Sequence, residues 1–191
     1  MNDRGYLFLL IGVVLIASPL LGVPNDIASF GTIFIFIGIR SMQTSQRELQ
    51  NALYFAIFGL IINWSSWLGV ELIPDFFIQF RLVPLLFVLE RFFDIGVFFW
   101  LLKAEYMWAP NKQKRLEWLG SSALGAVYFF MIALTVFSGV DLLINLSPNM
   151  LFLIFRIRRP LSLAYYGSLV FIFAKLYHES RGGGSGLRRW N

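Results

Sequence analysis

The sequence has 191 residues, of which 58% are hydrophobic, 18% aromatic and only 14% charged. A soluble domain of this size is far less apolar, so the composition predicts an integral membrane protein. The formal net charge of +5 indicates membrane orientation and contact with anionic lipids, and we do not expect nucleic acid as a partner.

Residue types that carry redox and metal chemistry are scarce. The chain has no cysteine, which excludes disulfides, iron–sulfur clusters and cysteine nucleophiles. Its one histidine, His178, argues against a bis-histidine haem and against a histidine-based zinc site. We therefore expect no metal and no cofactor.

Apolar segments recur along the chain at lengths that suit a hydrocarbon layer about 30 Å thick. The first lacks a small-x-small cleavage site and is interpreted as a retained helix. We predict an all-α, polytopic membrane protein, with one transmembrane domain over residues 1–180 and a flexible, Gly-rich, basic tail over 181–191. The alternative is a seventh span over 141–155. The six expected spans cover residues 6–23, 27–42, 51–70, 82–103, 118–140 and 160–177.

Three turns between these spans share a pattern of Gly-Val, then Pro, then Asn or Asp: "LGVPND", "LGVELIPD" and "SGVDLLINLSPN". Glycine suits the left-handed residue that ends a helix, proline cannot continue the helix, and Asn or Asp caps the next one. The pattern predicts three helical hairpins whose turns lie on one side.

Lys and Arg are concentrated at both ends of the chain and in segments 40–50 and 103–118. Because cytoplasmic loops carry the excess of these residues, we expect a multi-pass protein of the plasma (inner) membrane with both termini in the cytoplasm. Four arginines break the rule on the outer side: Arg81, Arg156, Arg158 and Arg159.

Short apolar segments over 75–80 and 149–155 precede these arginines and are predicted to form interfacial helices. The arginines would then lie at headgroup level, where a guanidinium group suits phosphate or carboxylate. They are candidates for outer anion or headgroup contacts. The alternative is that they only reach lipid phosphates or pair with nearby acids.

Glu90, Arg91 and Asp94 interrupt the apolar run "FVLERFFDIGVFFWLLK". On a helix, Glu90 and Asp94 share a face and Arg91 reaches Asp94, so the group must face other helices. Asn63 and Tyr166 come to similar depths and, with Tyr128, Tyr165 and Ser168, are the predicted partners. A ligand-binding or coupling site and a structural salt bridge that fixes helix register both fit.

The sequence favours a transport or substrate-capture protein for an anionic or lipid-like ligand. One alternative is a non-catalytic subunit, sensor or scaffold of a membrane complex that docks through segment 103–118; the other is a membrane-embedded lipid-processing enzyme. The enzyme is least favoured because no nucleophile or phosphate-binding motif accompanies the carboxylates, and catalytic residues stay unassigned. Expected partners are membrane lipids, an anionic small molecule or lipid, and a membrane-protein partner or second copy.

Overall fold

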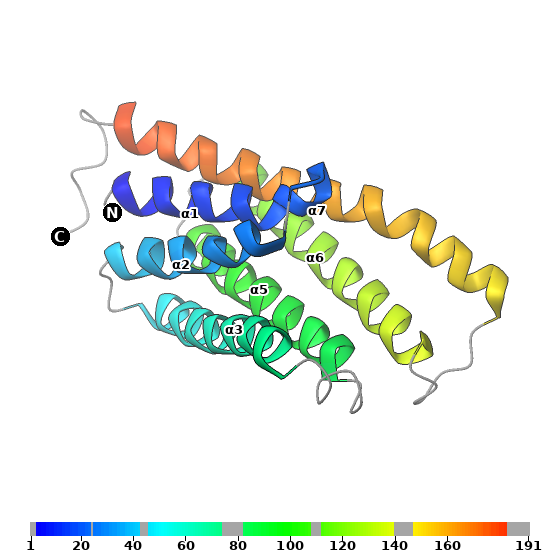
Figure 1. The fold of residues 1–191 in the computed structure, drawn as a ribbon. Coiled ribbons are helices and arrows are strands. Elements are labelled where there is room, and N and C mark those ends of the chain that lie inside the picture. The colour runs from blue at the N-terminus through cyan, green and yellow to red at the C-terminus, as the bar shows by residue number, and fades with distance from the viewer. Residues whose placement is uncertain are drawn as a thin grey trace.

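The structure is a computed structural model and describes residues 3–23, 25–42, 46–73, 82–107, 112–139 and 147–182. All regular secondary structure in these ranges is helical, which confirms the predicted all-α class there (Figure 1). The predicted tail lies almost wholly outside the described residues. The elements are α1 (Asp3–Ala17), the 3-10 helix η1 (Ser18–Leu21), α2 (Asn25–Ser41), α3 (Arg47–Leu72), α5 (Leu82–Met107), α6 (Lys112–Gly139) and α7 (Pro148–Gly182).

Consecutive α-helices pack on one another, and α7 packs back on α1, so the helices close into a ring. The start of α1 and the end of α7 lie at the same end of the bundle (Figure 1). The ends of α3 and α6 and the starts of α5 and α7 lie at the opposite end. Large buried side chains, including Leu9, Phe98, Tyr165, Leu169 and Phe173, fill the space between the helices.

Among the described residues, four helical segments are long and apolar enough to cross a membrane: Asp3–Leu21, Arg47–Gly69, Lys112–Ser138 and Asn149–Arg181. The apolar part of α2, Ile27–Ser41, is shorter. Helix α5 is not among the four, and it carries charged residues at its centre. Six crossings therefore stay a prediction.

The first turn has the glycine geometry that the sequence predicts. Gly22 has a φ of 87°, and its N–H bonds to the carbonyl oxygen of Pro19 at 3.1 Å. The corresponding Gly69 does not end its helix, because α3 continues to Leu72 and the N–H of Ile73 bonds to the Gly69 carbonyl at 2.9 Å. A Gly-Val pair alone does not stop a helix when the residues after it are helix-compatible.

Helices α1 and α2 approach at glycine. A Cβ atom at Gly12 would lie 2.9 Å from the carbonyl oxygen of Gly31, and one at Gly38 would lie 3.0 Å from that of Gly5. Both distances are tighter than almost all real Cβ contacts, so each glycine lets the facing backbone come close. The two helices therefore form a tight pair between these glycines.

Helix α7 corrects the predicted interfacial helix over 149–155. That segment is the first part of one continuous helix of 35 residues, with Pro160 inside it. The helix begins at Pro148, and Ser147 caps it in place of Asn149 by accepting a bond from the N–H of Met150 at 3.4 Å. Proline removes only one intrahelical bond and so does not end the helix here. The other predicted interfacial helix, over 75–80, lies outside the described residues.

Candidate functional site

The three charged residues lie at the middle of α5. Asp94 is ten residues from Pro84 and nine from Lys103, and the apolar sequence of α5 extends on both sides of it. Its side chain is 10% exposed and that of Arg91 is 17% exposed. Charges held this far from water need partners, because desolvation penalises them strongly.

Arg91 is the centre of the cluster. Its Nη1 atom donates to Oδ2 of Asp94 and to the hydroxyl oxygen of Tyr166 on α7, each at 3.1 Å. The guanidinium carbon lies 5.2 Å from the centre of the Phe87 ring, one helical turn earlier. The Nε atom is buried and has no hydrogen-bond partner among the described residues. Arg91 is therefore held firmly but keeps an N–H that another acceptor could use.

Three tyrosines gather beside Arg91. The ring of Tyr166 lies 5.1 Å from that of Tyr165 and 6.0 Å from that of Tyr128 on α6. All three side chains are buried. A hydrogen bond of 2.7 Å between the hydroxyls of Ser121 and Ser168 joins the same two helices. The cluster thus connects α5, α6 and α7 through polar groups.

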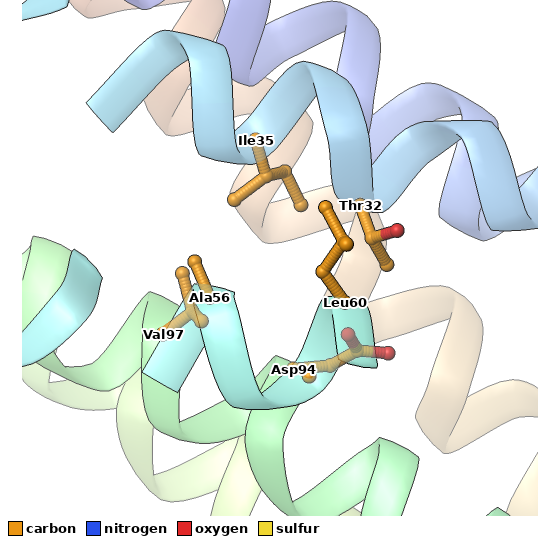
Figure 2. Close-up of a pocket in the computed structure, with 7 residues that line it drawn as sticks. Thr32, Ile35, Ala56, Leu60, Asp94 and Val97 are labelled. Carbon is orange, nitrogen blue, oxygen red and sulfur yellow. The ribbon is translucent and has the colours of Figure 1, made fainter. Parts of the chain in front are cut away.

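Asp94 also lines a small cavity between α2, α3 and α5. The cavity measures about 10 Å³, which is close to the space that one water molecule needs. Figure 2 shows Asp94 from α5, Leu60 from α3 and Thr32 from α2 around it. The Thr32 hydroxyl donates to its own helix, at the Ser29 carbonyl, so its oxygen keeps acceptor capacity toward other groups. This space fits a water or a proton carrier and not an organic ligand.

The predicted partners of the two carboxylates are only partly brought together. Tyr166, which was expected at the depth of Asp94, contacts Arg91, about one helical turn away from Asp94. Glu90 interacts with Ser66 on α3. The Oδ1 atom of Asn63 is buried without a hydrogen-bond partner among the described residues.

The outer arginines lie on the first half of α7, except for Arg81, which falls outside the described residues. Arg156 and Arg159 are exposed, and the guanidinium group of Arg158 lies 5.3 Å from the Phe155 ring centre. Arg159 donates to the carbonyl oxygen of Leu20, in the turn between α1 and α2, at 3.4 Å. No acidic side chain of the described residues pairs with these three arginines.

Two parts of the site were not predicted. Phe87 lies four residues before Arg91, a spacing that places both on one helix face and could have identified it. Ser66 lies three residues beyond Asn63, about one helical turn.

The described residues contain no group of three or more His, Cys, Asp or Glu side chains that could hold a metal ion. Comparison with models of protein families, with curated proteins and with solved structures finds no match.

Proposed function

We propose that this protein is a membrane-embedded transport or substrate-capture protein for an anionic, lipid-like ligand. The outer arginines receive the anionic group, and the cluster of Glu90, Arg91 and Asp94 responds to its binding. In the part of the chain that the structure describes, four helices are long and apolar enough to cross a bilayer, and they support the membrane location. The cluster lies at the middle of α5, where ionisable side chains in membrane proteins usually serve function.

The observation that carries the proposal is that one helix connects the two charged regions. Arg159 and Tyr166 are seven residues apart on α7, which is about two helical turns or roughly 10 Å on the same face. Arg159 contacts the α1–α2 turn, and Tyr166 accepts a hydrogen bond from Arg91. A displacement of α7 at Arg159 therefore reaches Arg91 through Tyr166.

Pro160 lies between these two points. It has no N–H, so the carbonyl of Arg156 lacks its intrahelical donor, and helices bend most easily at such positions. The first half of α7 can then change its angle, and the change reaches Tyr166, which lies six residues beyond Pro160 where the buried second half begins. We expect ligand binding at the arginines to change this angle.

The chemistry of the arginines supports an anionic ligand. A guanidinium group binds phosphate or carboxylate oxygens with two parallel hydrogen bonds, and Arg156 and Arg159 are exposed without acidic partners among the described residues. The apolar side chains Phe152 and Phe155, 68% and 52% exposed on the same stretch of helix, suit a hydrocarbon tail. A lipid-like amphiphile satisfies both features.

Lipid titration of the purified protein, followed by native mass spectrometry, tests the proposal. The probes are phosphatidylglycerol, which is anionic, and phosphatidylcholine, which is zwitterionic. We expect Arg156→Gln with Arg159→Gln to weaken phosphatidylglycerol binding about tenfold, which corresponds to about 1.4 kcal/mol. Competition by glycerol 3-phosphate would show that a free phosphate suffices.

The matched control is Arg40→Gln with Arg47→Gln. It removes the same charge from exposed arginines at the other end of the bundle. Equal loss of binding in both double variants would reduce the effect to net charge and would overturn the proposed site.

A further inference from the structure

A cleft separate from the cavity at Asp94 lies beside α5, on the face of the helix that is turned away from the centre of the bundle. It measures about 270 Å³ and is lined by side chains of α3, α5, α6 and α7. Most of the residues that line the cleft are aromatic, and the small residues Gly96 and Ala126 leave its volume unfilled. A Cβ atom at Gly96 would collide with the Phe55 ring, so this position admits only glycine in the present packing. The cleft is thus a built feature of the helix packing.

The length of the cleft matches one leaflet of a bilayer. On α5 it runs from Phe92 to Leu102, and the ten steps between these residues rise about 15 Å, which is half of a hydrocarbon core of about 30 Å. The stretch lies between the middle of α5 and the end where both α1 begins and α7 ends. A hydrocarbon chain that enters from that leaflet would fit along it.

The cleft opens toward the surroundings of the bundle. Phe92 and Phe99 line it and are nevertheless 44% and 45% exposed. In a membrane this opening faces lipid chains and not water. An occupant can therefore enter sideways without crossing a polar barrier.

A cationic side chain, that of Lys103, lies at one end of the cleft. The Nζ atom of Lys103 lies 4.6 Å from the centre of the Trp100 ring, and Trp100 lines the cleft. Within the described part of the chain, Lys103 has no acidic partner. Two other lysines near this end, Lys114 and Lys175, are paired with Glu179 and Glu117, and Lys112 is exposed at the start of α6 and does not line the cleft. Lys103 is thus placed to bind an anionic headgroup whose chain lies in the cleft.

We infer that the cleft between α5 and α6 binds one acyl chain of an anionic phospholipid from the leaflet at the end where α1 begins, with Lys103 on its phosphate. The apolar aromatic wall, the one-leaflet length, the lateral opening and the cation at the mouth all fit this occupant. The site goes beyond the proposed function and shares with it only the location in a membrane, because the outer arginines lie at the other end of the bundle.

Photolabelling tests the site in the unaltered protein. The probe is phosphatidylglycerol with a diazirine on its acyl chain, in bilayers of phosphatidylcholine. We expect the label on residues 92–102 and 122–129. Labelling at equal yield on the exposed face of α3, at Tyr54, Phe58 and Ile61, would show general contact with bulk lipid and would overturn the inference.

Cleft filling gives an independent readout. Ala126→Trp should fill the cleft and reduce cleft labelling at least fivefold, whereas Ala123→Trp, at an exposed position of α6 that does not line the cleft, should leave it unchanged. Undiminished labelling in a folded Ala126→Trp variant would contradict the site. Dissociation of a lipid-free wild-type dimer by Ala126→Trp would instead identify a second copy as the occupant.

The headgroup part of the inference has its own pair of variants. Lys103→Gln should abolish the preference for the phosphatidylglycerol probe over the same diazirine chain on phosphatidylcholine, while labelling by the phosphatidylcholine probe persists. Lys112→Gln removes the same charge from an exposed position at the start of α6 and should keep the preference. A preference that survives Lys103→Gln would contradict the role of Lys103. Loss of phosphatidylglycerol binding in the outer arginine variants does not affect the labelling of the cleft. The proposed function and the proposed cleft site can therefore be contradicted independently.

Discussion

The Nη1 atom of Arg91 lies 3.1 Å from the hydroxyl oxygen of Tyr166, and this bond joins α5 to α7 across 75 residues of sequence. The same Nη1 atom binds Asp94, so one buried group connects a carboxylate to a neighbouring helix. The proposed response of the cluster to events at the outer arginines depends on this link.

Tyr166→Phe should remove the acceptor while keeping the ring. The N–H of Arg91 would then be left without that partner, at a cost of about 1 to 3 kcal/mol in the free energy of unfolding. Denaturant unfolding of the purified protein measures this. Tyr165→Phe is the control, because it keeps the bond between Arg91 and Tyr166 and should cost clearly less. Equal losses would mean that the bond contributes nothing specific.

Removal of one charge and removal of all three should have opposite consequences for the fold. Arg91→Leu leaves Glu90 and Asp94 without their cation and should cost about 1 to 3 kcal/mol, moderated by the 17% exposure of the Arg91 side chain. Glu90→Gln, Arg91→Leu and Asp94→Asn together remove the uncompensated charge and should restore near-normal stability.

Function separates the two interpretations of the cluster. If the cluster is a working site, the folded triple variant should lose the response to phosphatidylglycerol even though the ligand still binds the outer arginines. A triple variant that folds and responds like the wild type would leave only a structural salt bridge.

Glycine contacts between α1 and α2 predict strong dependence on side-chain size. Gly12→Ala and Gly31→Ala should each destabilise the protein by about 1 to 3 kcal/mol, because the new methyl group meets the facing backbone. Gly167→Ala is the matched control, since a Cβ atom there meets nothing within 4 Å. It should be neutral or stabilising by up to about 1 kcal/mol, because alanine favours helix. Thermal unfolding distinguishes these outcomes, and equal effects at Gly12 and Gly167 would contradict the packing.

The topology makes a simple prediction. A reporter fused after Asn191 and one fused before Met1 should lie on the same side of the membrane, because α1 begins and α7 ends at the same end of the bundle (Figure 1). A reporter placed after Ile73, at the end of α3, should lie on the other side. Reporters at the two termini on opposite sides would exclude an even number of crossings.

Helix type and position could be predicted from the sequence because long apolar runs and the turn at Gly22 are local signals. The start of α7 at Pro148 could not be predicted, because Pro160 is typical of the first turn of a helix. Only the packing of the whole helix keeps α7 continuous through Pro160. Glycine pairing between α1 and α2 depends on which faces meet, and a single helix does not reveal this.

The site shows the same limit. The spacing of Glu90, Arg91 and Asp94 predicts their shared location, and the bond between Arg91 and Asp94 follows from helix geometry. Partners on other helices depend on tilt and rotation, so counting residues found Tyr166 to within one turn and did not identify Ser66. The cleft at Phe92 and Gly96 could not be predicted because four separate helices form it.

The central claim is that ligand binding at the outer arginines reaches Arg91 through α7. The fluorine NMR signal of 3-fluorotyrosine at position 166, recorded in nanodiscs of phosphatidylcholine with and without phosphatidylglycerol, tests it most directly. We expect a chemical-shift change on addition of the anionic lipid that disappears in Arg156→Gln with Arg159→Gln and persists in Arg40→Gln with Arg47→Gln. An unchanged signal in a wild-type protein that demonstrably binds phosphatidylglycerol at its outer arginines would contradict the account.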